Sequence, residues 1–190
     1  LRKFSIPNLN ISNRLLLSEC CRKNFTKGLE ILLENGISPK YPVTTVYQSP
    51  LIACTINNNV EGVKLLIKNG AQIDLINSHG ESALHLAAGS GYSSLVQVLA
   101  ENKADLDLAE TENKNTALHL AAYNGHTKVV EYLLAKDAQT DLLNTDGISA
   151  LHLAAQKDHS SIVQLLAENN ADLDLAESKK NNTALHLASY

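Results

Sequence analysis

Four histidines recur along the chain at nearly even intervals, and imidazole is a common metal ligand. His85, His119, His152 and His186 each stand in a copy of the motif Ala-Leu-His-Leu-Ala. A zinc site needs its ligands within about 2 Å of one ion. Successive histidines are 33 or 34 residues apart, and packed helical layers would hold them roughly 10 Å from one another. The spacing therefore predicts no shared metal ion and favours a structural role.

Two acidic pairs have the Asp-x-Asp spacing of some metal sites. They are Asp105 with Asp107 and Asp172 with Asp174. The positions in the same phase, Asp74 and Asp141, carry the second aspartate without the first. An acidic residue that returns in phase is typical of a scaffold position, where a short side chain holds a turn. We expect no metal site and no cofactor.

The three cysteines could supply a nucleophile or a disulfide. Cys20 and Cys54 fall in the slot that Ala87 fills in a later copy of the motif, so we expect both to be small buried side chains. No residue beside Cys21 would activate a thiolate. The sequence also has no phosphate-binding loop, nucleophile elbow or zincin signature, so we predict no catalytic residue and no enzyme. An odd number of cysteines favours a reducing compartment, which we take to be the cytoplasm.

The elements that carry these residues are repeats. The segment Ser82–Ala88 returns with few changes at Thr116, Ser149 and Thr183, and a looser copy begins at Ser49. These starting positions differ by 33, 34, 33 and 34 residues. A fixed period near 33 residues predicts a stacked array of repeats.

Each repeat carries the signals of two short helices. The Ser or Thr that opens each copy is a predicted N-cap, and Pro50 fits the first helical position. A second helix follows with apolar i, i+3 spacing, as in Val96 and Leu99. Polar turns such as 144–147 then predict hairpin-like connections, which we call fingers. Left-handed backbone is expected at Asn58, Gly91, Gly125 and Asp158 between the helices, and at Gly36, Gly70, Lys103, Asp137 and Asn170 after them.

The full pattern is Ser/Thr, Ala/Pro, Leu-His-Leu-Ala-Ala, then Gly-His, Val-Val-x-x-Leu-Leu and Ala-Asp-Leu-Asp. It resembles the ankyrin repeat over roughly residues 12 to 190. The resemblance implies an all-α solenoid of stacked helix-turn-helix pairs with β-hairpin-like finger loops. It also implies that the recurring histidines bridge neighbouring loops by hydrogen bonds. His126 and His159, at the turn between helices, are predicted to be structural too, and His79 is the histidine predicted to be free for a partner.

The period divides the chain into units. A leader at 1–11 precedes a degenerate first repeat at 12–43, which lacks the Ser/Thr and the His. Repeats follow at 44–76, 77–110, 111–143 and 144–177, and an incomplete one at 178–190. Terminal repeats usually turn one face to water, and Arg14, Arg22, Lys23 and Lys27 fit that role. We expect the chain to be a segment of a longer protein.

A longer period of 67 residues is also visible. The stretches 82–110 and 149–177 are nearly the same sequence, which indicates duplication of a two-repeat unit. Each is followed by a finger that is one residue longer than usual and has no Gly at its tip, at 111–115 and 178–182. We expect these fingers to differ in shape from those that contain Gly80 and Gly147.

Charge and hydropathy exclude some classes of partner. The net charge of −4 disfavours a general nucleic-acid role. Residues 1–40 carry seven Lys/Arg and three Glu, which leaves −8 on the remainder. This uneven charge either attracts a charged partner or is the ordinary variation of charge over a protein surface. No apolar run is long enough to span a membrane, and no signal peptide is evident.

The remaining chemistry is on the surface. In the family that the pattern resembles, the fingers and first helices line a concave face that binds other proteins. The candidate partner-binding residues on it are Tyr47, Ile56, His79, Glu81, Lys114, Asn115, Tyr123, Asn124, Asp146, Ile148, Gln156 and Lys157. We expect a monomer that binds another protein and has no small-molecule substrate. Two alternatives remain: the substrate-recruiting array of a larger enzyme or bacterial effector whose catalytic domain lies outside this segment, or a structural, self-associating array.

Overall fold

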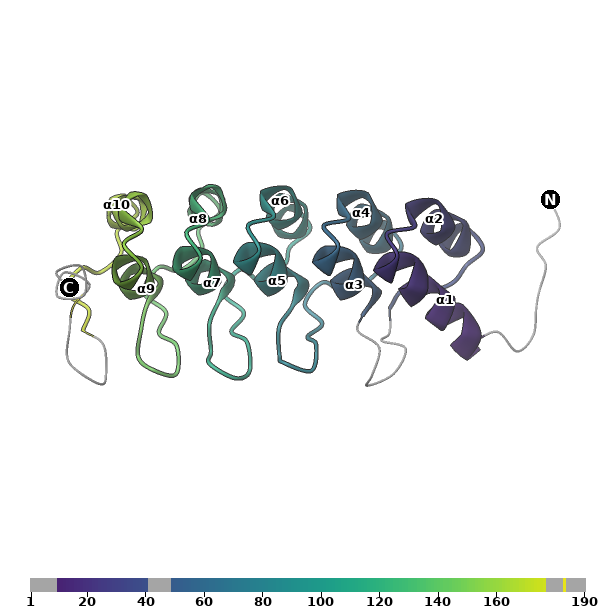
Figure 1. The fold of residues 1–190 in the computed structure, drawn as a ribbon, viewed down its shortest axis with the longest axis horizontal. Helices are drawn as coiled ribbons and strands as arrows, with labels where there is room; N and C mark the ends of the chain where they lie inside the picture. The colour runs from purple at the N-terminus through teal and green to yellow at the C-terminus, as the bar shows by residue number, and fades with distance from the viewer. Residues whose placement is uncertain (1–9, 41–48, 177–182, 184–190) are drawn as a thin grey trace.

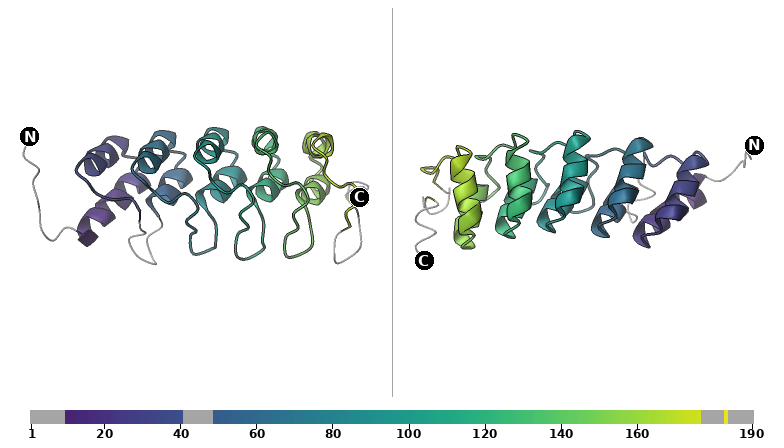
Figure 2. Two further views of the ribbon diagram at one scale, coloured as in Figure 1. Left: turned by 180° about the vertical axis from the view of Figure 1, so that it is seen from behind. Right: turned by 90° about the horizontal axis from the view of Figure 1, so that it is seen from above.

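The computed structural model describes residues 10–40, 49–176 and 183, with only the backbone for 10–14. These residues form ten α-helices and no strand, arranged as five helix pairs in single file (Figure 1, Figure 2). The helices are α1 Asn10–Arg22, α2 Thr26–Glu34, α3 Pro50–Ile56, α4 Val60–Lys68, α5 Ala83–Gly89, α6 Ser93–Glu101, α7 Ala117–Tyr123, α8 Thr127–Leu134, α9 Ala150–Gln156 and α10 Ser160–Glu168. Odd-numbered helices form one row and even-numbered helices a second, and the fingers project beyond the odd-numbered row (Figure 1). The expected all-α solenoid is confirmed.

The start of each first helix follows the predicted capping chemistry in three repeats. Ser82, Thr116 and Ser149 each accept a hydrogen bond from the backbone N–H three residues later, and that residue's imidazole bonds back to the cap. Such reciprocal caps satisfy backbone donors that a helix start otherwise leaves free. Ser49 stands at the same position but its side chain makes no capping bond, so that prediction was wrong. Its third helical residue is Ile52, which has no imidazole to complete the pair.

The turns have the predicted left-handed backbone. All nine residues named from the sequence have positive φ, including Asn58 at 51° and Asp158 at 57°. Lys103 also has a positive φ, 68°, although this left-handed region is sterically unfavourable for a lysine. The first helix begins at Asn10, two residues before the expected start of the first repeat at residue 12.

The core is a thin layer of aliphatic side chains that runs through every repeat. Ala87 and Leu95 are buried side chains of the third repeat, and the second repeat has Cys54 and Gly62 in their places. A Cβ atom added to Gly62 would lie 2.7 Å from the Asn59 Nδ2 and 2.9 Å from the Cys54 Sγ, so the Asn59 side chain and the cysteine together leave room only for glycine. The second repeat thus has the larger residue at the first position and the smaller one at the second, and the third repeat has the reverse.

The cysteine prediction was half right. Cys54 is fully buried as expected, whereas Cys20 is only half-buried and its neighbour Cys21 is the fully buried one. A hydrogen bond between the Cys21 and Cys54 thiols, together with burial, raises the pKa of Cys21. The thiol of Cys21 is therefore protonated at neutral pH and packs as a small apolar group.

The first repeat is a less polar cap than its sequence suggests. Arg22 pairs with Glu19 and Lys27 with Glu30 on the surface, while the Arg14 side chain lies outside the described residues. Leu16, Phe25 and Ile31 are about half exposed, although the corresponding side chains of later repeats are better covered. In the described part of the chain, no other repeat stands before this one to cover these three side chains.

Candidate functional site

Histidine links join the third repeat to the fourth and the fourth to the fifth. The Nδ1 atom of His85 accepts the backbone N–H of Ser82 at 3.1 Å, so its Nε2 carries the proton and donates to the carbonyl oxygen of Asn115, also at 3.1 Å. His119 makes the same bond to Ile148. Burial lowers the pKa of both imidazoles and keeps them neutral. The prediction that these histidines bridge neighbouring loops is confirmed for these two.

The other histidines of the pattern divide into two groups. His126 bonds back to the carbonyl of Gly89 at 3.0 Å and His159 to that of Tyr123 at 3.2 Å, so both are structural as predicted. The Nε2 of His152 has no hydrogen-bond partner among the described residues. His186 lies outside them.

The aspartates that recur in this phase of the repeat accept hydrogen bonds within and between repeats. Asp74 accepts the backbone N–H of Asp105 at 3.2 Å, and Asp141 accepts that of Asp172 at 2.9 Å, in each case one repeat further along. Asp105 in turn accepts the N–H of Asp107, which closes its own turn. The carboxylates are thus used by the scaffold, as the sequence predicted.

The fingers are built by side chains that accept backbone N–H groups. In the fingers that contain Gly80 and Gly147, which we call the Gly fingers, this residue is Asn. The Asn77 Oδ1 accepts the backbone N–H groups of His79 and Glu81, each at 2.9 Å, and Asn144 does the same in its own finger. Gly80 adopts a φ of 76° against the next finger, where an added Cβ would lie 2.6 Å from the Thr111 backbone nitrogen. The tip therefore requires glycine.

The longer finger at 110–115 is built differently, as expected from its extra residue. The carboxylate of Glu110 accepts the backbone N–H groups of Glu112, Asn113 and Asn115 at 2.6 to 3.1 Å. Burial opposes the charged form, but these three bonds together lower the pKa of Glu110. Lys114, with φ of 60°, takes the left-handed place that glycine holds elsewhere. The second longer finger, at 178–182, lies outside the described residues.

Neighbouring fingers are tied to one another. The backbone N–H of Thr145 donates to the backbone carbonyl of Asn113 at 2.8 Å, and the Asn144 side-chain amide donates to the side-chain Oδ1 of Asn115 at 3.0 Å. Together with the first helices, these fingers form one continuous surface, which we call the finger face. Its side chains project from a preorganised backbone.

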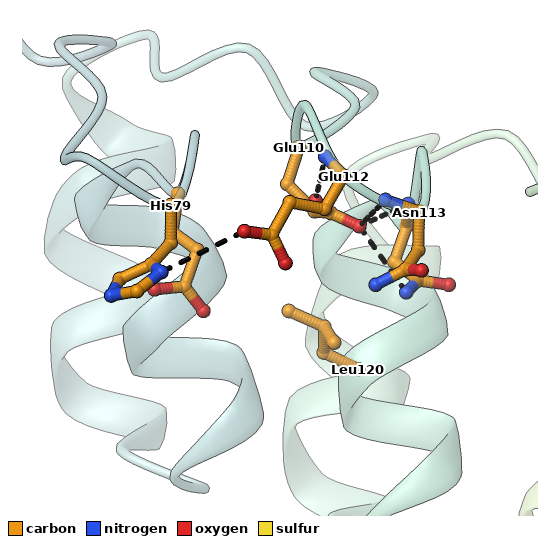
Figure 3. Close-up of a pocket in the computed structure, with 7 residues that line it drawn as sticks. His79, Glu110, Glu112, Asn113 and Leu120 are labelled. Carbon is orange, nitrogen blue, oxygen red and sulfur yellow. Dashed lines mark hydrogen bonds and ion pairs between the residues drawn. The ribbon is translucent and has the colours of Figure 1, made fainter.

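A hollow of about 310 Å³ lies on the finger face between the third and fourth repeats (Figure 3). Its lining residues are His79, Glu81, Glu110, Glu112, Asn113, Asn115 and Leu120. In Figure 3, His79 and Glu112 point toward each other from neighbouring fingers, with Leu120 on the helix beside them. The His79 Nδ1 lies 3.7 Å from the Glu112 Oε1.

A family model for ankyrin repeats, in three copies, matches residues 17–110, 51–144 and 118–190. The chain belongs to the ankyrin-repeat family. Its curated relatives include the Notch-regulated ankyrin repeat-containing protein of Xenopus tropicalis, 40% identical over 87 residues that make up 44% of this chain and 76% of the relative. The human protein of that name is 39% identical over 87 residues, with the same coverage. The chicken nuclear factor NF-kappa-B p105 subunit is 34% identical over 68 residues, which are 36% of this chain and 7% of the relative.

The ankyrin array exposes several of the candidate partner-binding residues. Ile56 and Tyr123, at the ends of α3 and α7, are 46% and 43% exposed. The Lys157 Nζ lies 4.4 Å from the centre of the Tyr123 ring, a cation–π contact between successive repeats. Gln156 and Asn124 are exposed beside them. Tyr47 lies outside the described residues.

Other candidates take part in the scaffold. The backbone carbonyl and the side chain of Asn115 both accept hydrogen bonds within the array, so Asn115 has few free polar groups for a partner. Asp146 and Ile148 are half-buried in the Gly finger of the fifth repeat. His79 has a neighbouring carboxylate, that of Glu112, and is less free than the sequence suggested.

The hollow includes residues that sequence reasoning missed, namely Glu110, Glu112, Asn113 and Leu120. The extra residue of the finger was the available signal. It predicted a different shape but did not reveal which carboxylate organises the loop.

Among the described residues, no three His, Cys, Asp or Glu side chains come together as metal ligands would. In the same part of the chain, none of the helices has the length and apolar character that a bilayer crossing needs.

Proposed function

We propose that this ankyrin array binds a partner protein on its finger face and has no catalytic role within residues 1–190. Ankyrin repeats are protein–protein interaction modules, and this chain belongs to that family. None of the three relatives named above carries an enzyme name. These similarities support the class of function, and the position of the binding surface is our own inference.

The observation that carries the proposal is the exposure of Ile56 and Tyr123 on the same row of helix ends. The corresponding position of the intervening repeat is Gly89, so the two apolar side chains flank a gap. Aromatic side chains that are exposed but held in place are favoured anchors in protein interfaces. Lys157 holds the ring of Tyr123 from one side.

The hydrogen bonds within and between the fingers support a binding role. A surface that is already ordered loses little conformational entropy when a partner binds. Glu110 and Asn144 fix the shape of two adjacent fingers through backbone N–H groups. The finger face therefore presents its side chains at a low ordering cost.

The experiment compares partner capture by matched variants. Ile56→Ala with Tyr123→Ala removes the two apolar anchors, and Gln97→Ala with Glu131→Ala changes two exposed residues of the even-numbered row. We expect proteins captured by the unmodified array to be lost with the first pair and kept with the second. Loss with the second pair alone would place binding on the opposite row and contradict the proposal.

A core variant separates folding from binding. Leu118 is 1% exposed, and Leu118→Ala should cost about 2–5 kcal/mol of unfolding free energy. At a temperature where this variant is still folded, we expect its capture of partners to be unchanged. The Ile56 and Tyr123 variants should lose capture of partners while the free energy of unfolding changes little.

We further propose that the array works as a monomer in the cytoplasm. Its three cysteines are free thiols, two of them fully buried, which suits a reducing compartment. Light scattering of the chain at micromolar concentration should give the mass of one chain. The mass of a dimer or larger assembly would favour the alternative of a self-associating array.

A further inference from the structure

The hollow on the finger face has two kinds of wall. Its upper part consists of polar finger residues, including Glu81 and Glu112 from two neighbouring fingers, and its floor is the half-buried Leu120 of α7. The lining includes three carboxylates and no lysine or arginine. A ligand for this hollow rests on the proposed function, because that ligand would be part of the same partner protein.

The three carboxylates are not equivalent. Glu110 is 5% exposed and is used by the backbone N–H groups of its own finger. Glu81 bonds to Asn77 through Oε2, and its Oε1 has no hydrogen-bond partner among the described residues. The Glu112 side chain is 65% exposed, and its Oε1 lies 3.7 Å from the His79 Nδ1. Glu81 and Glu112 can therefore accept hydrogen bonds from a ligand, and their charges are uncompensated when His79 is neutral.

The floor is suited to a hydrocarbon chain. Leu120 is the apolar residue among the side chains that line the hollow, and it is half-buried, so part of its side chain is accessible there. An apolar floor and an acidic rim in one hollow fit a side chain with an aliphatic stem and a cationic head.

We propose that this hollow receives an arginine or lysine side chain of the partner protein. The aliphatic stem packs on Leu120, and the cationic head lies between Glu81 and Glu112. Charge-assisted hydrogen bonds to carboxylates are the stronger kind, and a planar guanidinium can bond to both fingers at once. The excess of negative charge after residue 40, −8 against +4 for residues 1–40, favours the approach of a basic segment.

The test uses small probes, so it does not require the partner to be known. Butylguanidinium, methylguanidinium and butyrate are titrated separately into the isotope-labelled chain, and backbone amide shifts are followed by NMR. We expect butylguanidinium to bind most tightly, with its largest shifts at Asn113 and Leu120. Methylguanidinium, which lacks the stem, should bind at least threefold more weakly, and butyrate should not bind at this site.

A charge-matched pair of variants decides whether the site is specific. Glu81→Gln with Glu112→Gln should weaken butylguanidinium binding at least tenfold. Glu61→Gln with Glu131→Gln removes the same net charge from exposed residues of α4 and α8 and should leave binding unchanged. Equal loss in both double variants, or shifts spread evenly over acidic residues, would overturn the inference. If the probes fail while Ile56 and Tyr123 variants still lose protein partners, only this inference falls and the proposed function stands.

Discussion

The Nε2 atom of His119 in α7 lies 3.1 Å from the carbonyl oxygen of Ile148, which is 29 residues later and belongs to the next repeat. The same imidazole caps its own helix through Thr116. One buried side chain therefore satisfies backbone groups of two repeats. Such bonds give a thin stack, with little core in each repeat, part of its cohesion.

Replacing His119 by alanine should destabilise the array. The change leaves the half-buried carbonyl of Ile148 and the buried backbone N–H of Thr116 without their partner, at a cost of about 1–3 kcal/mol for the buried group and less for the other. Urea unfolding followed by circular dichroism measures the loss. His79→Ala, at an exposed finger residue, is the matched control and should change stability by less than about 0.5 kcal/mol. Equal losses in the two variants would contradict the role given to His119.

Stability should fall as the pH drops from 7 to 5. Burial lowers the pKa of His85 and His119 below the unfolded value of about 6.5. The unfolded chain then binds more protons than the folded one in this range, so the free energy of unfolding rises with pH. The contribution is present above the unfolded pKa and is lost as the pH falls from about 6.5 through the lowered pKa of the folded imidazoles.

The measurement is the midpoint of thermal unfolding at several pH values between 5 and 7, where the carboxylates contribute little. In a variant with His85→Gln and His119→Gln, we expect lower stability at pH 7 and a shallower dependence on pH. A midpoint of the unmodified chain that does not change, or that rises toward pH 5, would show that these imidazoles do not fold in the neutral form.

Exchanging the volumes of Cys54 and Gly62 tests the packing of the second repeat. Gly62→Leu should be destabilising by about 1–3 kcal/mol, since even a Cβ would lie 2.9 Å from the Cys54 Sγ. Adding Cys54→Ala recreates the Ala87 and Leu95 pair of the next repeat and should recover part of that loss. Recovery is partial because the side chain of Asn59 also lies within 2.7 Å of the new Cβ.

A double-mutant cycle in urea measures this coupling. If the losses of stability in the two single variants simply add in the double variant, the two positions do not share volume. That result would contradict the packing described for the core.

Glu110 should be necessary for the longer finger. Glu110→Gln keeps the size of the side chain but replaces a charged acceptor of three backbone N–H groups. Bonds to charged groups contribute about 1.5–3 kcal/mol, so we expect a loss within or slightly below this range. Amide hydrogen exchange should be faster at Glu112, Asn113 and Asn115 and unchanged in the finger built by Asn77. Unchanged exchange at all three would contradict the assignment.

Most of the fold could be predicted from the sequence because the same residue types recur at the same capping and turn positions in each repeat. The caps at Ser82, Thr116 and Ser149 and the left-handed residues after the helices could be placed by type and period alone. Ser49 holds the same position without a capping bond, and its repeat also lacks the returning imidazole, since Ile52 stands three residues later. In the degenerate first repeat, which lacks the motif, nothing in the sequence shows that Cys21 is more deeply buried than Cys20.

The candidate site was predictable only in outline. Tyr123 and Ile56 could be placed on the surface by their phase in the repeat. The hollow could not, because it depends on the conformations of two fingers from different repeats and on a carboxylate, Glu110, that turns into its own loop. Its floor, Leu120, looked like a further member of the recurring motif.

Hydrogen exchange of the chain, alone and with a captured partner protein, tests the central claim most directly. We predict that the partner slows exchange in the fingers at 77–81 and 110–115 and at the ends of α3 and α7, and leaves α4, α6 and α8 unchanged. Protection confined to those even-numbered helices, with none on the fingers, would contradict the assignment of binding to the finger face.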